Sequence, residues 1–475
     1  MPVSLLLSSL MLVACADKGP LGPQRCTIEE PDPGALHTDG TTVRDELGRI
    51  VLLRGVNAGG RSKFPPYMPF DYPADDFAGS LDAYLDVAQS WGVNVLRVPF
   101  SWAALEPTRG QWDLEWLARY DALLDGAAAR DLWTIVDFHQ DIYGEFYCGD
   151  GFPRWTVLNP PADHHDCPSW FTAYLSDDDV AAAFDQLWAD TPVAPGEVGN
   201  RTALIEMWRA KAAHHAGRAG VIGYEILNEP FRGTADSATW GAETLPAFYS
   251  EAGRAIRDEA PESLLFFDST GLDAVAATTT IAPPEGEDWV FAPHWYDAAV
   301  LAGVDNLSAD PDAGLGAWAA QGAEWDMPVL IGEFGVGAEL GIATDYANAM
   351  WEALDRYQLS GTWWEYSASA ERWNDEALSL AGADGAPYPT TAGPLARPTP
   401  RLIAGEAPTW SLVEGVFSLS FEAVAGGVTE VRLPTSDPAW ARAAVEARGG
   451  CVDLAADRVL FRADRAGAAE LTLSR

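Results

Sequence analysis

Short, nearly uninterrupted apolar segments recur along most of the chain, and amphipathic segments lie between them. The apolar segments are residues 50–56, 93–98, 132–138, 221–227, 263–267, 289–292, 328–331 and 361–364. Strands that are apolar along their whole length are typical of parallel sheets that are buried on both faces. The pattern therefore predicts eight parallel strands.

The intervening segments carry apolar residues at the spacing of amphipathic helices. Such patterns occupy residues 81–90, 114–130, 203–216, 247–258, 315–324 and 346–357. Eight strand-then-helix units close into a barrel more readily than any other parallel arrangement. The sequence thus predicts an α/β fold, a (β/α)8 barrel over residues 36–402. The long connection after the third strand, 139–220, is expected to pass over one end of it and shape a substrate site.

The pattern changes after the segment from Arg397 to Pro400. Residues 410–475 alternate between apolar and polar positions, with glycine turns between the alternating runs. A period of two is that of strands with one buried face. We therefore predict a C-terminal antiparallel β-sandwich domain over residues 403–475.

The chain begins with a largely apolar run that ends in Leu12-Val13-Ala14-Cys15. This ending resembles the lipobox of bacterial lipoproteins, in which Cys15 would be lipidated, although no Lys or Arg precedes the run. We expect residues 1–15 to be a signal peptide and the Pro- and Gly-rich residues 16–35 to be a linker. The protein would then be exported to the bacterial cell envelope, anchored or secreted. An ordinary signal peptide or a buried strand is the alternative.

Export would place the four remaining cysteines in an oxidising compartment. Four cysteines allow three connectivities. Cys148 and Cys167 lie in one Gly- and Pro-rich stretch, so we predict that they pair. Cys26 and Cys451 would then form the other bond and tie the N-terminal segment to the C-terminal domain.

The composition narrows the choice of partner. The formal net charge is −40, from 70 acidic and 30 basic residues, and such a chain would be repelled by a phosphate backbone. We expect no nucleic-acid partner and a monomer. No CxxC occurs, and the histidine pairs 164–165 and 214–215 lack the i, i+4 spacing of helical metal ligands, so no metal and no cofactor are expected.

Two glutamates follow apolar segments at the ends of predicted strands four and seven. Glu229 stands in Asn228-Glu229-Pro230, and Glu333 stands in Gly332-Glu333-Phe334. Barrel enzymes place catalysis at the carboxyl ends of their strands. Two carboxyls that face each other across a pocket are what glycosidic cleavage requires. We predict Glu229 as acid/base, with a pKa raised by the charge of Glu333, and Glu333 as the nucleophile.

Other residues that could bind substrate or orient these carboxyls also follow the strands. They are Arg97, His139, Asn228, His294, Tyr296 and Trp364. Arg97 could hold Glu333 ionised through a charge-assisted bond, and Tyr296 could donate to the same carboxylate. His294 could set the proton state of Glu229. His139 and Asn228 could bind sugar hydroxyls, and Trp364 offers a stacking face.

Together these residues resemble glycoside hydrolase family 5 over residues 40–400. The likeness is greatest to the endoglycoceramidase branch, through the run from Asp137 to Tyr143 and through the segment 54–57 followed by Lys63. The resemblance implies cleavage of the bond between a glycan and ceramide. It also implies that Lys63, Asp141, Asn228 and Trp364 hold the sugar nearest the ceramide.

The apolar loop 64–70 could line a channel for the lipid chains of such a substrate, or it could pack on the barrel rim. Action on glucosylceramide, another β-glucoside or a β-glucan is the alternative within the same chemistry. A catalytically silent surface lectin, and a C-terminal domain that binds carbohydrate by itself, are further alternatives.

Overall fold

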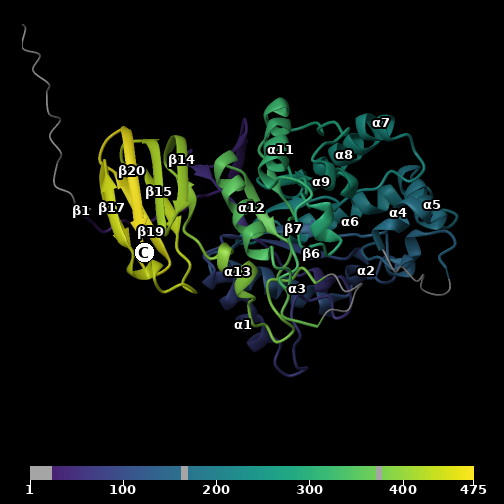
Figure 1. Ribbon diagram of the computed structural model, residues 1–475. Coiled ribbons are helices and arrows are strands. Elements are labelled where there is room, and N and C mark those ends of the chain that lie inside the picture. The colour runs from purple at the N-terminus through teal and green to yellow at the C-terminus, as the bar shows by residue number, and fades with distance from the viewer. Residues whose placement is uncertain (1–23, 162–169, 371–376) are drawn as a thin grey trace, which may run out of the picture.

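The computed structural model describes residues 24–161, 170–370 and 377–475. Within these ranges the chain forms a barrel of eight parallel strands surrounded by helices, with a β-sandwich beside it (Figure 1). Each predicted apolar segment contributes a barrel strand, so the predicted (β/α)8 barrel is confirmed. The strands are β5 (Arg54–Asn57), β6 (Val95–Phe100), β7 (Trp133–Phe138), β8 (Val221–Glu225), β9 (Leu264–Phe267), β10 (Trp289–Phe291), β11 (Leu330–Ile331) and β12 (Ser360–Trp363).

The barrel strands lie in the order β10-β9-β8-β7-β6-β5-β12-β11. A parallel bridge between Phe291 and Val329 joins the two ends of this sheet, and the Phe291 N–H donates to the Pro328 carbonyl. β6 and β7 are buried at every position, which explains why most of their residues are apolar. The carboxyl ends of the strands therefore meet at one face of a closed barrel.

The six predicted helices are present and surround the barrel. They are α1 (Phe77–Ser90), α3 (Leu114–Ala128), α6 (Asn200–His215), α8 (Leu245–Arg257), α11 (Pro311–Trp325) and α12 (Ala343–Tyr357). Asp76, Asp113 and Asp310 begin α1, α3 and α11 by accepting backbone N–H groups, as N-cap residues do. The remaining described α-helices are α2 (Trp102–Leu105), α4 (Ala173–Ser176), α5 (Asp178–Trp188), α7 (Ser237–Thr239), α9 (Gly271–Ala276), α10 (Ala298–Leu301) and α13 (Pro389–Leu395).

A hairpin covers the amino-terminal end of the barrel. Leu36 of β2 (Leu36–Asp39) and Val43 of β3 (Thr42–Asp45) pack in one buried cluster with Val95 and Trp133 at the start of barrel strands. The Thr38 N–H also donates to Asp288 Oδ1 at 2.8 Å. The hairpin covers this end with apolar side chains, while the polar residues that follow the strands lie at the opposite end.

Two sheets form the sandwich. Burial alternates along Val416–Ala423 and Gly467–Ser474 of the smaller sheet, as predicted, whereas Val428–Arg432 of the larger sheet is buried at every position. The larger sheet contains β1 (Gln24–Arg25), β18 (Gly450–Leu454), β19 (Arg458–Ala463), β16 (Val428–Arg432), β13 (Thr399–Ile403), β4 (Ile50–Val51), β3 and β2, in that order. The other contains β14 (Gly405–Val413), β15 (Val416–Ala423), β20 (Gly467–Ser474) and β17 (Ala444–Arg448). Trp410, Phe417, Val431 and Phe461 are among the side chains that fill the space between the sheets.

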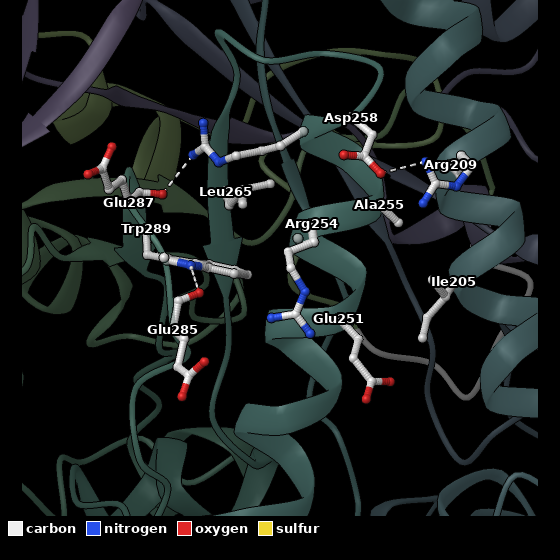
Figure 2. Close-up of a pocket in the computed structure, with 13 residues that line it drawn as sticks. Ile205, Arg209, Glu251, Arg254, Ala255, Asp258, Leu265, Glu285, Glu287 and Trp289 are labelled. Atoms are coloured by element: carbon white, nitrogen blue, oxygen red, sulfur yellow. Dashed lines mark hydrogen bonds and ion pairs between the residues drawn. The ribbon is translucent and has the colours of Figure 1, made fainter.

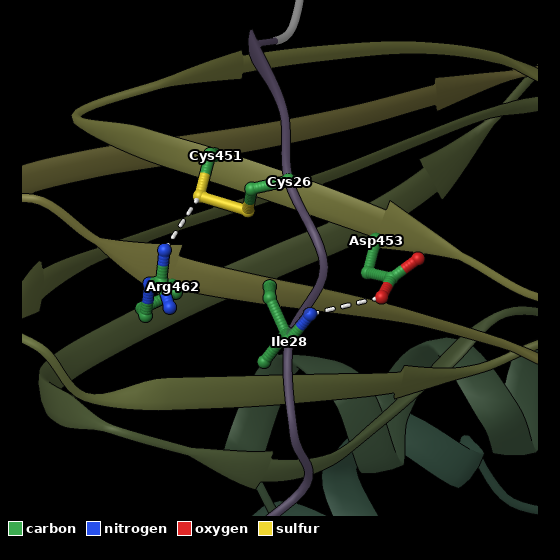
Figure 3. The surroundings of a disulfide bond; sticks show 5 residues. All are labelled: Cys26, Ile28, Cys451, Asp453 and Arg462. Carbon is green, nitrogen blue, oxygen red and sulfur yellow. Dashed lines mark hydrogen bonds between the residues drawn. A yellow bond between two sulfur atoms is a disulfide. The ribbon is translucent and has the colours of Figure 1, made fainter.

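Residues 24–35, which belong to the expected linker, lie along the larger sheet. Cys26 forms a disulfide with Cys451 of β18, with 5.8 Å between their Cα atoms (Figure 3). The Ile28 N–H donates to Asp453 Oδ2 at 2.9 Å, and the Ile28 side chain is buried. This part of the chain is therefore held against the sandwich by a covalent bond and by packing.

Two sequence predictions fall partly on residues that are not described. Cys148 is disulfide-bonded, but Cys167, its predicted partner, lies outside the described residues. Cys15, the predicted lipidation site, also lies outside them. Among residues 24–161, 170–370 and 377–475, no helix combines the length and the apolar character needed to cross a bilayer.

Candidate active site

Arg97, in the middle of β6, is fully buried and contacts several groups of the site. It bonds both carboxylate oxygens of Glu225 at 2.7 Å, donates to Glu333 Oε1 at 2.8 Å, and donates to Asn228 Oδ1 at 2.8 Å. Burial opposes its charge, but the carboxylates of Asp137, Glu225 and Glu333 raise the pKa of Arg97 well above its ordinary value. The charged guanidinium fixes Glu333 and Asn228 in place.

Glu333 follows β11 and is 5% exposed. Arg97 holds its Oε1, and the Tyr296 hydroxyl donates to its Oε2 at 2.9 Å. His294 Nδ1 lies 3.4 Å from the same Oε2. The carboxylate is thus oriented from two sides by donors on other strands.

Glu229 follows β8, and its Oε1 lies 2.8 Å from His294 Nδ1. Burial, followed by the negative charge of Asp141, raises the pKa of Glu229 to about 7. The direction is the predicted one, but the predicted cause was the charge of Glu333. Burial also lowers the pKa of His294 to about 4, so its ring is neutral at pH 7. Glu229 is therefore partly protonated near neutral pH.

A second group of predicted residues lines the site beside this cluster. Lys63, in a 3-10 turn after β5, bonds Asp141 Oδ2 and lies 4.7 Å from the centre of the Trp364 ring. His139 stacks on Trp364 at 4.9 Å, and its Nδ1 lies 2.9 Å from Asp137 Oδ2. Burial opposes protonation of His139, but the charge and hydrogen bond of Asp137 and the hydrogen bond of Asp141 together outweigh it and raise the pKa of His139 to about 10. All four predicted side chains are buried, and the Trp364 ring, which is 1% exposed, is covered by His139 and Lys63.

Asn228 is 1% exposed, and both polar atoms of its side chain are bonded within the protein. Its Oδ1 accepts from Arg97, and its Nδ2 donates to the Gln140 carbonyl at 3.1 Å. A sugar hydroxyl could still reach the second lone pair of Oδ1. The structure therefore brings together all the predicted site residues, from Lys63 to Trp364.

Several buried acids at the site were not predicted from the sequence, and Asp137, Glu225 and Asp150 are among them. Asp137 and Glu225 contact Arg97, and burial raises the pKa of Glu225 to about 7 against the opposing charge of Arg97. Burial and then the charge of Asp141 raise the pKa of Asp150 to about 8. An acid inside an apolar run, as Asp137 and Glu225 are, is a usable signal, because a buried charge needs a partner.

The apolar loop 64–70 is buried at its end and partly exposed at its start. Met68 and Phe70 are buried in the main core, whereas Phe64, Pro66 and Tyr67 are half-buried and Pro65 is exposed. The end of the loop therefore packs on the barrel, which is the alternative left open above, and its first half remains at the surface.

Two other features lie away from this site. A cavity of about 420 Å³ opens between α6 and α8, and the residues that line it include none of the predicted site residues (Figure 2). Its Arg209 is paired with Asp258 at 2.8 Å. On α6, His214 and His215 both bond the Asp121 carboxylate, which Arg218 also contacts at 2.9 Å.

Hydrolysis of a glycosidic bond requires two carboxyls, one that holds a proton and one that is ionised. Glu229 and the Arg97-bound Glu333 form such a pair at the carboxyl end of the barrel. The family described as Cellulase (glycosyl hydrolase family 5) matches residues 62–370. The chain belongs to this family, as the resemblance predicted.

Relatives and solved structures refine this comparison. The chain is 32% identical over 273 residues to endoglycoceramidase I of Rhodococcus hoagii, over 55% of this chain and 52% of that protein. It is 28% identical over 246 residues to a glucosylceramidase of Aspergillus fumigatus, over 42% of this chain and 32% of that protein. The chain thus spans about half the length, or less, of these two relatives. Endo-glycoceramidase II from Rhodococcus sp. superposes with a TM-score of 0.74 at 25% identity, over 93% of this chain and 99% of that one.

Proposed function

We propose that the chain is a retaining endo-β-glycosidase that cleaves the bond between the glycan and the ceramide of glycosphingolipids. The observation that carries this proposal is the short distance between Glu229 and Glu333. A carboxyl oxygen of Glu229 lies within 4.8 Å of a carboxyl oxygen of Glu333. A short separation favours direct attack by a carboxylate over attack by an interposed water. The likeness to endoglycoceramidases supports the choice of substrate.

In the first step, Glu333 would attack the anomeric carbon while Glu229 gives its proton to the leaving oxygen. The bond from that carbon to the ceramide oxygen breaks, ceramide leaves as an alcohol, and the glycan is esterified to Glu333. Arg97 and Tyr296 hold the attacking carboxylate, and the raised pKa of Glu229 keeps its proton available.

In the second step, Glu229, now ionised, would take a proton from water as that water attacks the anomeric carbon. The ester to Glu333 breaks, and the free oligosaccharide leaves with Glu229 protonated again. His294 Nδ1 lies 2.8 Å from the Glu229 carboxyl and 3.4 Å from the Glu333 carboxyl, so it contacts both catalytic groups.

The sugar next to the ceramide would lie against Trp364, with its hydroxyls bound by Lys63, His139 and Asp141. These residues contact one another in one group. Lys63 and His139 can donate hydrogen bonds to sugar hydroxyls, and the Asp141 carboxylate can accept hydrogen bonds from them. We further propose that the protein is exported and acts as a monomer, with lipid attachment at Cys15 holding it near a membrane. The disulfide between Cys26 and Cys451 supports an oxidising compartment.

The test is to incubate the purified protein with a ganglioside and with glucosylceramide in detergent and to separate the products. Intact oligosaccharide and ceramide from the ganglioside are the expected result, and Glu333→Gln should lower the rate by at least about 10³-fold because the nucleophile is lost. Asp310→Asn, at the start of α11, is the matched control and should keep full activity. No ceramide from either lipid would refute the proposed substrate.

A second candidate is hydrolysis of glucosylceramide or another simple β-glucoside. The likeness to the Aspergillus fumigatus glucosylceramidase favours it. Release of ceramide from glucosylceramide alone would establish this candidate in place of the first.

A further inference from the structure

The backbone of Glu229 has an uncommon conformation. Its φ angle is 38°, on the left-handed side of the map that residues other than glycine seldom occupy. Such a conformation persists only where the surroundings fix it. Two side chains from the neighbouring strands β7 and β9 contact this peptide, one on each side.

Asp268 follows β9 and is 1% exposed. Its Oδ2 accepts the Glu229 backbone N–H at 3.0 Å, and its Oδ1 accepts the Ser269 N–H at 2.6 Å. The same Oδ2 lies 3.3 Å from Nε2 of His294, whose other ring nitrogen bonds the Glu229 carboxyl. Asp268 therefore contacts Glu229 at its backbone and reaches its side chain through His294.

Gln140 follows β7 and is fully buried. Its Nε2 lies 2.9 Å from the carbonyl oxygens of both Asn228 and Glu229, and its Oε1 accepts the Tyr143 N–H at 3.0 Å. Asp268 and Gln140 thus bond this backbone from the strands on either side of β8.

We propose that Asp268 and Gln140 are positioning residues that clamp the Glu229 backbone and so aim its carboxyl at the leaving oxygen. This inference rests on the function proposed above. Rotation about the Glu229 backbone would carry the carboxyl away from His294, and a displacement of about 1 Å can cost 10²-fold in rate. The clamp acts on Glu229 alone, because Glu333 is held separately by Arg97 and Tyr296.

Two substrates with different leaving groups can distinguish a positioning role of Asp268 and Gln140 from a purely structural role. An alkoxide leaves only with a proton from Glu229, whereas 2,4-dinitrophenolate leaves without one. We expect Asp268→Ala and Gln140→Met to lower kcat/KM on the order of 10²-fold for octyl β-lactoside and less than about threefold for 2,4-dinitrophenyl β-lactoside. Asp268→Asn keeps an acceptor for the Glu229 N–H and should recover most of the loss.

Asp310→Ala and Gln89→Met carry the same kinds of substitution on α11 and α1 and should change neither rate. If one clamp variant does not fold, the other decides the question. Equal losses on both lactosides, or no loss on octyl lactoside, would overturn the clamp while leaving the proposed function intact. A wild-type protein that cleaves neither lactoside would overturn the clamp together with the proposed function.

Discussion

At the scale of single residues, charge partners decide which carboxyl at the site keeps its proton. Asp141 is 2% exposed and the side chain of Glu229 is 12% exposed, yet their pKa values shift in opposite directions. Burial and the charge of Asp141 raise the pKa of Glu229 to about 7, whereas Lys63 and His139 overcome burial and lower the pKa of Asp141 to about 2. The two acids therefore differ in charge at neutral pH because Asp141 bonds the Lys63 ammonium directly, whereas Glu229 bonds the neutral ring of His294.

This difference predicts the pH dependence of the reaction. The acid form of Glu229 is needed for the first step, so kcat/KM for an alkyl glycoside should fall above about pH 7, tenfold per pH unit. Asp141→Asn removes a negative charge that raises the Glu229 pKa, so the basic limb should move to lower pH. The measurement is kcat/KM against pH for both proteins.

Asp113→Asn, which removes a carboxylate at the start of α3, is the control and should leave the limb in place. A limb that stays near pH 7 in the Asp141 variant, or that moves to higher pH, would contradict the electrostatic account of Glu229.

At the scale of elements, the short helix α9 shows how closely a loop segment can approach the catalytic group. No helical pattern was predicted between β9 and β10, because six residues are too few to show a helical period. Thr270 begins the helix with a capping box that includes Asp273. The helix thereby places Gly271 against the Glu229 carboxyl, where a Cβ atom would lie 2.4 Å from Oε2.

We predict that Gly271→Ala lowers kcat/KM for an alkyl glycoside by about 10- to 100-fold. The added methyl would displace the Glu229 carboxyl, and small displacements of a catalytic group are costly. The melting temperature should change little, because the side chain that must move is the flexible end of one glutamate. Steady-state kinetics and thermal melting together test both parts.

Gly393→Ala is the matched control. Gly393 lies in α13, and a Cβ atom there would meet no other described atom within 4 Å. This variant should be as active as the wild type, and an equal loss in both variants would contradict the steric explanation.

At the scale of the whole molecule, the barrel and the sandwich are connected at several places. The larger sheet takes strands from both ends of the chain, including β1 and β18. Asp131, at the amino-terminal side of β7, contacts Arg401, Arg432 and Arg458 of that sheet. The disulfide between Cys26 and Cys451 closes a loop of 425 residues across these contacts.

We predict that the double substitution Cys26→Ser, Cys451→Ser lowers the free energy of unfolding by about 3–5 kcal/mol, since a cross-link over a long loop restricts the unfolded chain. Thermal melting without reductant measures the loss. Activity per folded molecule should be unchanged, because the bond lies in the sandwich. Melting of the double variant at the wild-type temperature would show that the contacts of residues 24–35 suffice without the bond.

The sequence by itself determined the barrel, the sandwich and the two glutamates. Strands buried on both faces are mostly apolar along their length, and strands with one buried face alternate, so each sheet type gives a different pattern in the sequence. Glu229 and Glu333 could be recognised because each is a charged residue directly after an apolar strand segment. The closeness of their positions followed from the geometry of parallel strands.

The sequence also predicted Arg97, Tyr296 and His294 as partners of these glutamates, but only the tertiary structure added the buried acids Glu225 and Asp268. Arg97 meets Glu225 across 128 positions of sequence, and Asp268 meets Glu229 across 39. Contacts of this kind leave no local period, because they depend on which strands become neighbours when the barrel closes. The same closure sets burial, and burial is what raises the pKa of Glu229.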